Sequence, residues 1–470
     1  MNGEGEIDLQ AKKLHFIGIG GIGMSGIAKI LLHNGYQISG SDLSDSFLLD
    51  HLRSLGAQIY IGHQPDNIPE DTEMAVHSTA ISADNCELLE AKKRGLPVVS
   101  RAQMLSFLMR QKRSIGIAGS HGKTTTSGMI SLLLEQTGMD PTIIIGGTLP
   151  QINSNGKSGK GEYLVAEADE SDGTFLLLHP AIAVITNIEE DHMDFYKSMD
   201  DITNSFAIYV RQLPQDGFAV VNADCPQVRK IMKEIPADYV TYSICGGGAE
   251  YTACDFVFSA GGSGSNIYHL GKFLGRLELN IPGKHNVSNA LAAIALGSRI
   301  GLEFKAIAAA LAGFSGTGRR FELLGKVNDI VVIDDYAHHP TEIKATIAAA
   351  RQTEPGRLIT VFQPHRYSRT QVMKGEFGRS FAESHLTIIN EIYEAFEQPI
   401  EGVSARLIVE EAKKTGYKPI VYAKTQEEVV ELLLKETGTG DMVLIMGAGD
   451  IRNAGEEFVR RLKDEKEATI

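Results

Sequence analysis

Residues 114–138 read SIGIAGSHGKTTTSGMISLLLEQTG and predict a short buried strand, a glycine-rich turn and a helix. In such a turn, backbone N–H groups surround a phosphate chain, a lysine neutralises the β- and γ-phosphates and a hydroxyl ligates Mg²⁺. Lys123 and Thr124 stand at these two positions. The strict spacing of the motif needs a glycine where Ile117 stands. Because a strand and a helix flank the turn correctly, the stretch predicts an ATP-binding α/β domain.

Two acidic stretches follow later predicted strands: EADESDGTF at residues 167–175 and TNIEEDHMDFY at residues 186–196. The carboxyl ends of parallel strands open onto the crevice where ligands bind in sheets of this kind. Glu167 and His192 are therefore candidate ligands of Mg²⁺ or Mn²⁺ beside Thr124, since hard oxygen ligands with one imidazole suit these ions. An exposed acidic turn and a structural or solvated histidine are the alternatives.

A second glycine-rich turn lies near the N-terminus, in LHFIGIGGIGMSGIAKILLHNG at residues 14–35. Gly18, Gly20 and Gly23 follow a predicted strand, and Asp42 ends the next one. Taken alone, this pattern is typical of a dinucleotide-binding dehydrogenase. The chain offers no convincing hydride-transfer site, and the same turn could equally hold the pyrophosphate and ribose of a UDP-sugar. Strands and helices alternate to about residue 106, which predicts a small parallel α/β domain.

A third α/β segment begins after GTGRRF at residues 316–321, where strands and helices again alternate over about 150 residues, an ordinary domain size. DDYAHHP and FQPHRYSRT each follow a predicted strand. Arg366 and Arg369 are three residues apart, so their guanidinium groups converge if they share a helical turn. Paired planar forks are a natural grip on a carboxylate. A basic, solvated turn is the alternative.

Three further stretches carry weaker signals. GKHNVSNA at residues 283–290 opens a helix, where Asn286 is an ordinary N-cap candidate. Asn289 lies one turn further along the same face as His285, which also allows a shared ligand. Residues 151–161, QINSNGKSGKG, are polar and glycine-rich and predict a mobile loop near the phosphate chemistry. Residues 239–281 predict an antiparallel hairpin at the edge of the domain.

The composition sets limits on these interpretations. The 470 residues predict two to four domains. Lys plus Arg number 45 against 59 for Asp plus Glu, a net charge of −14, which argues against a nucleic-acid groove. The four cysteines lack zinc or redox spacing, which favours reduced thiols. An acidic, polar N-terminus and the lack of a long apolar run predict a cytoplasmic protein without a membrane segment.

In chain order, the motifs GxHGKTTT, EADESD, TNIExDHMD, HNxxN, GxGRRF, DDYxHHP and PHRYSRT resemble those of the Mur ligase family, across nearly the whole chain. The stretches around DDY and PHRYSRT follow the pattern of the L-alanine-adding member, although Ala337 replaces a usual glycine. The tripeptide ligase of wall recycling shares the order of motifs and is the alternative within the family. A nucleotide-dependent dehydrogenase and a non-catalytic nucleotide switch are more remote.

The resemblance implies an acid–amino-acid ligase of peptidoglycan precursor synthesis, and hence a part in cell shape and division. Such an enzyme uses ATP and Mg²⁺ (or Mn²⁺) to join L-alanine to the lactyl carboxylate of UDP-N-acetylmuramate through an acyl-phosphate. It implies a cytoplasmic monomer or weak homodimer. It also implies three α/β domains: a Rossmann-like UDP-substrate domain at 1–107, a P-loop ATP domain at 108–319 and a Rossmann-like amino-acid domain at 320–470.

Site residues follow from the resemblance position by position. The positions implied for the UDP-substrate are Gly18, Gly20, Gly21, Gly23, Asp42, His63 and Ser78. The positions implied for ATP are Gly119, Ser120, His121, Gly122, Lys123, Thr124, Thr125, His285, Asn286, Asn289, Arg320 and Asp335. The positions implied for the amino acid are Tyr336, His338, Arg366 and Arg369. The implied catalytic positions are Lys123, Glu167 and His192, and those for the metal are Thr124, Glu167 and His192.

Overall fold

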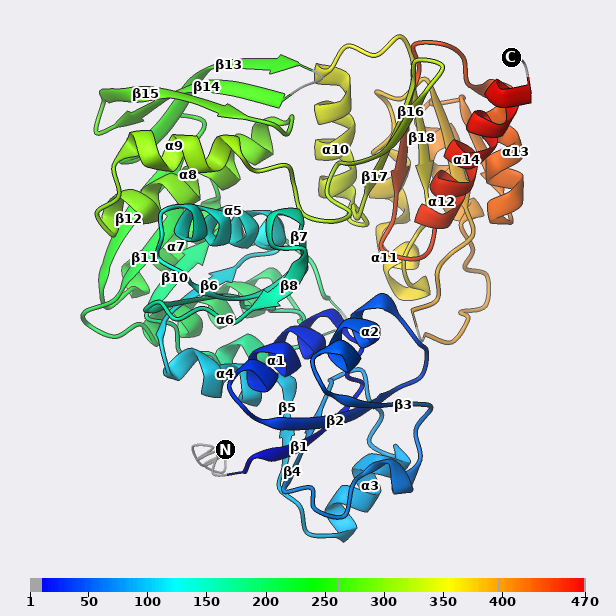
Figure 1. The fold of residues 1–470 in the computed structure, drawn as a ribbon. Helices are drawn as coiled ribbons and strands as arrows, with labels where there is room; N and C mark the ends of the chain where they lie inside the picture. The colour runs from blue at the N-terminus through cyan, green and yellow to red at the C-terminus, as the bar shows by residue number, and fades with distance from the viewer. Residues whose placement is uncertain (1–10, 194, 260–261, 396, 469–470) are drawn as a thin grey trace. The chain divides into compact units, whose positions relative to one another are not determined.

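The computed structural model describes residues 11–193, 195–259, 262–395 and 397–468 as an α/β chain with three sheets (Figure 1). Its contacts divide it into two compact units. The first comprises Met1–Ala253, Ile267–Gly275 and Ser288–Leu311, and the second Cys254–Asn266, Arg276–Val287 and Ala312–Ile470. The described helices include none that is both long and apolar enough to cross a membrane.

The N-terminal sheet has the strand order β3-β2-β1-β4-β5, and its neighbouring strands all pair in parallel. Its strands are β1 Lys13–Ile17, β2 Gln37–Asp42, β3 Gln58–Ile61, β4 Met74–His77 and β5 Val98–Ser100. Its helices are α1 Ile22–His33, α2 Phe47–Ser54, α3 Cys86–Lys93 and α4 Arg101–Arg110. The predicted parallel α/β domain is thus confirmed. Gly35, at φ +83°, adopts the left-handed conformation that commonly ends a helix.

A ten-stranded sheet carries the predicted phosphate loop, in the order β15-β14-β13-β12-β11-β10-β6-β9-β7-β8. Its strands are β6 Arg113–Ala118, β7 Thr142–Leu149, β8 Ser154–Lys157, β9 Tyr163–Glu167, β10 Ile182–Ile185, β11 Phe218–Asn222, β12 Asp238–Ser243, β13 Tyr251–Ser259, β14 Gly262–His269 and β15 Lys272–Leu279. Helices in this part are α5 Lys123–Gln136, α6 Met199–Arg211, α7 Pro226–Ile231, α8 Lys284–Arg299 and α9 Phe304–Ala312. Strand β6 lies between β9 and β10, parallel to both. The loop that follows β6 therefore emerges beside the ends of the two strands that precede the acidic motifs.

One sequence prediction for this part is wrong, and another is incomplete. Residues 151–161 are not a mobile loop, because strand β8 pairs antiparallel with β7. Asn155 in β8 is fully buried and donates to the carbonyl of Ile22 at 2.5 Å, so burial against α1 orders a polar segment. In the region 239–281, the consecutive strands β13, β14 and β15 are neighbours at the edge of the sheet, where a hairpin was predicted, and β12 in addition pairs in parallel with β11 and β13.

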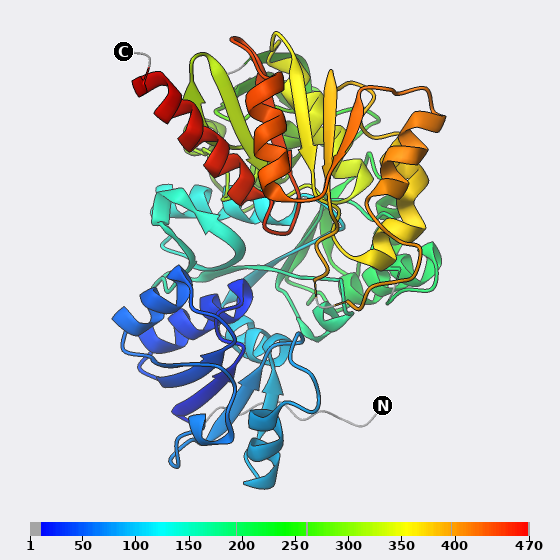
Figure 2. The same cartoon turned by 90° about the vertical axis from the view of Figure 1, so that its right-hand side faces the viewer.

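The C-terminal sheet has the order β16-β17-β21-β18-β19-β20, in which only β16 runs antiparallel to its neighbour. Its strands are β16 Glu322–Val327, β17 Ile330–Asp335, β18 Leu358–Phe362, β19 Leu386–Asn390, β20 Ile420–Ala423 and β21 Met442–Met446. Helices α10 Pro340–Gln352, α11 Tyr367–Gly378 and α12 Arg406–Lys414 contribute to one core of this domain. Helices α13 Gln426–Glu436 and α14 Arg452–Ala468 contribute to the other, and Figure 2 shows this orange and red pair on one face of the sheet. Helices on both faces confirm the predicted Rossmann-like arrangement.

Candidate functional site

The turn between β6 and α5 has the conformation that a phosphate loop needs. Gly119 and Gly122 have φ values of +144° and +82°, a region that side chains rarely adopt. Gly122 is the N-cap of α5 and provides no side-chain cap, so the first amides of the helix are left to a ligand. The positive end of the helix dipole favours an anion at this position. The predicted turn and its helix are thus present.

The segment after β10 forms hydrogen bonds with the turn between β6 and α5, and these contacts were not predicted from the sequence. The side-chain oxygen of Asn187 accepts a hydrogen bond from the N–H of His121 at 2.9 Å. The side-chain amide of Asn187 donates to the carbonyl of His121, also at 2.9 Å. The Thr186 hydroxyl donates to the same carbonyl at 2.7 Å. Both residues belong to the TNIEEDHMDFY motif, whose first polar residues therefore shape the phosphate loop. The two hydrogen bonds between the Asn187 side chain and the His121 backbone fix the conformation of the loop in the absence of a ligand.

Lys123 meets a carboxylate that the sequence analysis did not single out. Its Nζ lies 2.8 Å from both carboxylate oxygens of Glu170, whose side chain is 2% exposed. Burial alone would lower the pKa of Lys123, but the charges of Glu170 and Asp169 outweigh it and raise the pKa. The ammonium group is therefore charged at neutral pH. Glu170 belongs to the same EADESD motif as Glu167, which was the only available signal.

Glu167 lies where the sequence placed it, beside Thr124. The Thr124 hydroxyl donates to one carboxylate oxygen at 3.0 Å, and the Ser127 hydroxyl donates to the other at 3.0 Å. The N–H of Gly146 in β7 donates to that second oxygen at 2.6 Å. A hydroxyl and a carboxylate at the phosphate end of a P-loop form an oxygen donor set that fits a hard divalent cation.

His192 faces different carboxylates from the one predicted. Its Nε2 lies 3.6 Å from Asp191 and 3.9 Å from Glu170, in a backbone conformation at φ +55°. Tyr196 donates its hydroxyl to the carbonyl of Glu170 at 2.7 Å and so fixes that strand end from the same loop. The acidic motif therefore presents two groups of side chains, with Glu167 beside Thr124 and Glu170 between Lys123 and His192.

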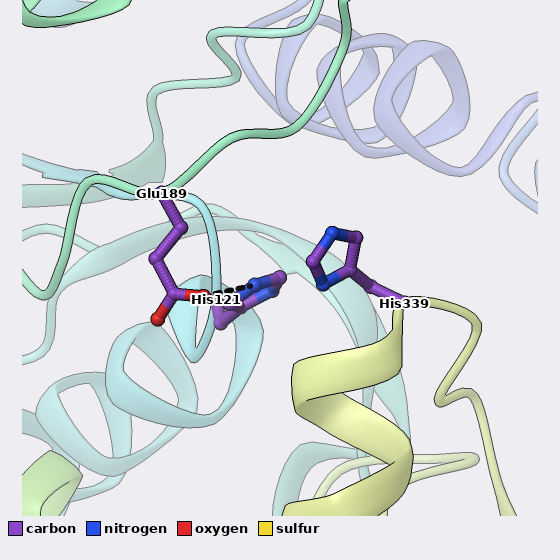
Figure 3. Close-up of side chains that lie close together, drawn as sticks. All are labelled: His121, Glu189 and His339. Atoms are coloured by element: carbon purple, nitrogen blue, oxygen red, sulfur yellow. Dashed lines mark ion pairs between the residues drawn. The ribbon is translucent and has the colours of Figure 1, made fainter. Parts of the chain in front are cut away.

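His121, predicted at the ATP site, forms an ion pair with Glu189. The two side chains face one another in Figure 3, with Nε2 of His121 3.5 Å from a carboxylate oxygen of Glu189. The N–H of Glu189 donates to the Ser120 hydroxyl at 2.9 Å, which links this segment to the phosphate loop. His339, also drawn in Figure 3, belongs to the second compact unit, where its ring accepts a hydrogen bond from the N–H of Thr341 at 3.3 Å.

Asn289 approaches the phosphate loop closely enough to make a testable contact. A Cβ added to Gly122 would lie 2.7 Å from the side-chain oxygen of Asn289. We expect Gly122→Ala to weaken ATP binding strongly, because the left-handed backbone alone costs roughly 1–2 kcal/mol for a non-glycine residue and the new methyl group also displaces Asn289. Titration of ATP and thermal unfolding measure the two effects.

Gly138→Ala provides the matched control for this substitution. Gly138 follows α5 with a similar φ of +79°, but a Cβ there meets nothing within 4 Å. The control should lose stability without losing ATP affinity. Equal loss of ATP affinity in both variants would show that the contact with Asn289 does not matter.

The second unit contains four of the predicted ATP positions: His285, Asn286, Arg320 and Asp335. Burial, with the charge of Arg320, lowers the pKa of His285 to about 4, so its imidazole is neutral at physiological pH. Burial also raises the pKa of Asp335 to about 6, although the N–H groups of Phe321 and Ala337 donate to its carboxylate at 2.8 and 2.9 Å. Asn286 donates its amide to the carbonyl of Pro282 at 2.7 Å, a local structural contact.

Basic side chains gather around the other predicted positions of this unit. Burial lowers the pKa of His365 to about 3, and the neighbouring charges of His338, Arg369 and Arg366 contribute to the same shift. The rings of His338 and His365 are 5.9 Å apart, and Tyr336 lies under the guanidinium of Arg320 at 5.1 Å. Such a concentration of positive charge favours an anionic ligand.

The two arginines do not share a helical turn as expected. Helix α11 begins at Tyr367, so Arg366 is its N-cap, with φ +74°, and only Arg369 lies in the first turn. The N–H of Arg366 donates to the carbonyl of Tyr393 at 2.9 Å, which anchors the residue to the end of β19 instead. His365 stacks on the ring of Tyr393 with centroids 5.7 Å apart, a partner that the sequence analysis missed.

Six of the seven predicted UDP-substrate positions lie at or just after the carboxyl ends of strands in the N-terminal sheet, and Gly23 lies in the first turn of α1. The N–H of Gly20 donates to the carboxylate of Asp42 at 2.8 Å, across the ends of β1 and β2. A Cβ on Gly18, at φ +80°, would lie 3.3 Å from Ser78, which follows β4. His63 follows β3, and its Nδ1 lies 3.0 Å from the hydroxyl of Ser41. This edge is the usual ligand edge of a parallel sheet.

Parallel sheets around two glycine-rich turns, one of them a P-loop, define the chain as a multidomain nucleotide-binding α/β protein. Models of the Mur ligase family match at three places: its catalytic domain at residues 13–113, its middle domain at 117–297 and its glutamate ligase domain at 319–449. The chain belongs to the Mur ligase family.

Named relatives match over nearly their whole length. The chain is 50% identical to the UDP-N-acetylmuramate–L-alanine ligase of Pelotomaculum thermopropionicum, over 96% of this chain and 98% of the relative. It is 48% identical to the same-named ligase of Desulforamulus reducens, with the same two shares. Among solved structures, a UDP-N-acetylmuramate–alanine ligase from Thermotoga maritima matches with a TM-score of 0.83 at 29% identity, over 96% of this chain and 99% of that one. A murein peptide ligase from Psychrobacter arcticus matches with a TM-score of 0.72 at 25% identity, over 96% and 98%.

Proposed function

We propose that the protein joins L-alanine to the lactyl carboxylate of UDP-N-acetylmuramate at the expense of ATP, in peptidoglycan precursor synthesis. The observation that carries the proposal is the P-loop, in which Lys123 meets Glu170 and Thr124 meets Glu167. The relatives at 48–50% identity share the name of this activity over nearly the whole chain. The cytoplasm is the compartment in which such a soluble, ATP-dependent reaction would occur, without nucleic acid or membrane partners.

The phosphoryl transfer makes specific demands on these residues. The lactyl carboxylate attacks the γ-phosphorus of ATP, a bond forms between them, and the bond to the β-phosphate oxygen breaks to release ADP. Lys123 stabilises the charge on the transferred group, which requires it to exchange Glu170 for a phosphate oxygen. Two Mg²⁺ or Mn²⁺ ions, when one is bound at Thr124 and the second at Glu167 and His192, would reduce the repulsion between the two anionic substrates.

The second step requires the amino acid. The amine of L-alanine attacks the carbonyl of the acyl-phosphate, and inorganic phosphate leaves as the amide bond forms. Arg366 and Arg369, with Tyr336 and His338, bind the alanine in this proposal. His285, Asn286, Asn289, Arg320 and Asp335 act on the ATP side, and Gly18, Gly20, Gly21, Gly23, Asp42, His63 and Ser78 hold the UDP portion.

The same reasoning assigns the domains. The UDP-substrate domain comprises residues 1–107, the ATP domain 108–319 and the amino-acid domain 320–470, as the motifs predict. The active form is a monomer or weak homodimer in this proposal. Limited proteolysis followed by mass spectrometry would locate the boundaries, since cleavage between domains falls in exposed connecting segments.

A phosphate-release assay tests the proposed function. Release of phosphate from ATP should depend on UDP-N-acetylmuramate and L-alanine together, because the acyl-phosphate needs both partners to turn over. The assay is run over the other amino acids and over the L-alanyl-containing tripeptide. Preference for the tripeptide would assign the chain to the recycling branch of the family instead. Efficient turnover with muramate that lacks UDP would contradict the role of the N-terminal domain.

A further inference from the structure

Glu87 is a carboxylate fully buried in the N-terminal domain, and it is not among the site residues predicted there. It lies in the first turn of α3, and its side chain is 0% exposed. One oxygen accepts from the Asn67 amide at 2.6 Å and from the N–H of Gln64 at 3.1 Å. The other lies 3.3 Å from Nε2 of His15 and accepts from the Ser41 hydroxyl. Both oxygens are thus fully engaged by polar groups.

These contacts keep the carboxylate ionised inside the domain. Burial alone would raise the pKa of Glu87, but hydrogen bonds from His15, Ser41 and Asn67 outweigh it and lower the pKa to about 2. A buried charge of this kind adds little stability that well-packed apolar residues could not supply. We therefore look for a functional role of Glu87 beyond stability, and the residues that contact it indicate one.

The contacts of Glu87 converge on His63 and its loop. The Ser41 hydroxyl donates its hydrogen to Glu87, so its oxygen is left to accept the Nδ1 hydrogen of His63 at 3.0 Å. Nδ1 also lies 3.5 Å from the carboxylate itself. This order of donors selects the imidazole tautomer with hydrogen on Nδ1. The backbone of the loop is held as well, since Asn67 donates to both Glu87 and the carbonyl of Gly62.

The opposite ring nitrogen of His63 is the one available to a ligand. The His63 side chain is 10% exposed, and among the residues that the structure describes its side-chain hydrogen bond is made through Nδ1. The ring lies at the same sheet edge as Asp42, which contacts the glycine-rich turn. With hydrogen on Nδ1, Nε2 is a hydrogen-bond acceptor.

We propose that Glu87 is a positioning residue for the nucleotide-sugar site: through Ser41 it holds His63 with Nε2 as an acceptor for a hydrogen-bond donor of the uridine group. This inference rests on the proposed UDP-substrate binding. The donors that uridine offers are the ribose hydroxyls and the N3–H of uracil. UDP, 2′-deoxy-UDP and N3-methyl-UDP as titrants separate these two sources.

Glu87→Gln tests the inference directly in the full chain. We expect the KM for UDP-N-acetylmuramate to rise roughly tenfold, the loss of about one hydrogen bond, while kcat and the KM values for ATP and L-alanine stay unchanged. Imidazole ¹⁵N NMR should show His63 losing its Nδ1–H tautomer. His63→Ala should give a similar rise in KM, and the double variant no further rise. Glu90→Gln, on the same helix but paired with Arg94 at the surface, is the control and should change nothing.

The outcomes separate the inference from the proposed function. An unchanged His63 tautomer, or unchanged UDP-substrate affinity, in folded Glu87→Gln would overturn the positioning role. If Glu87→Gln shifts the His63 tautomer as expected but His63→Ala leaves the affinity for the UDP-substrate unchanged, the assignment of His63 to the UDP site is wrong. If Glu87→Gln does not fold, Ser41→Ala decides, because it removes only the link to His63. It should shift the tautomer and raise the KM alike, and failure to do so overturns the inference.

Discussion

Lys123→Ala is expected to abolish ligation while leaving the affinity for UDP-N-acetylmuramate nearly unchanged. The ammonium group is the cation of the P-loop and lies in a different domain from the glycine-rich turn around Gly18. Removing one charge that faces the developing phosphoryl charge costs roughly 3 kcal/mol or more of transition-state stabilisation. Phosphate release and a UDP-substrate titration measure the two quantities. An equal loss of phosphate release and of UDP-substrate affinity would show that the assignment of Lys123 to the ATP site is wrong.

Stability has to be separated from catalysis in this variant. Lys123→Ala leaves Glu170, which is 2% exposed, without its cation, and breaking a buried pair costs about 3–5 kcal/mol. The double variant Lys123→Ala with Glu170→Gln removes the unpaired carboxylate charge of Glu170. This double variant should recover thermal stability but no activity. Lys112→Ala is the control and should keep its activity, because it removes a lysine that donates to the carbonyls of Gly159 and Gly161.

The elements with regular local signals were predictable from the sequence. The strand, turn and helix of residues 114–138 follow from a buried apolar run, two glycines and a helix-forming stretch, and the structure shows all three. The parallel N-terminal sheet follows in the same way from alternating strands and helices. Strand β16 was missed because ELLGKV is short, contains a glycine and has only Val327 buried. Its pairing with β17 gives the segment its structure.

Side chains that act through distant partners could not be predicted. Asn155 is buried because Lys29 donates to it at 2.7 Å from a helix 126 residues away in sequence, and nothing local distinguishes QINSNGKSGKG from a mobile loop. Glu87 likewise reads as an ordinary acid in the first turn of a helix, where the dipole favours it. Glu170 stood inside a recognised motif, but only the fold shows that it, and not Glu167, contacts Lys123.

The proposed amino-acid site is the region for which the fold adds most to the sequence analysis. Arg366 and Arg369 were grouped by their spacing and by the family resemblance, but helix α11 begins at Tyr367, one residue too late to include both arginines. The two arginines instead share a neighbour, His365. Burial is the main cause that lowers the pKa of His365 to about 3, and the charges of His338, Arg369 and Arg366 lower it further. An anion bound here would relieve repulsion among these groups. A carboxylate from the amino acid satisfies that requirement.

Arg369→Lys is expected to raise the KM for L-alanine strongly while the KM for ATP changes little. Lysine keeps the charge but loses the planar fork that binds a carboxylate through two hydrogen bonds. Loss of one charge-assisted hydrogen bond, about 1.5–3 kcal/mol, corresponds to a rise of roughly ten- to hundredfold. Acyl-phosphate formation should survive, because phosphoryl transfer precedes attack by the amine. Rapid-quench detection of the intermediate and the three KM values measure these effects.

The control for this substitution lies on the same helix. Arg379 caps the far end of α11 and is exposed, so Arg379→Lys should leave every KM unchanged. A rise in the KM for ATP with an unchanged KM for L-alanine would assign Arg369 to the phosphates. The carboxylate clamp would then have to include His338 and Arg366 without it, and His338→Ala would become the variant that raises the KM for L-alanine. Because both results come from one set of titrations, the assignment of the basic group to alanine or to ATP is decided by which KM moves.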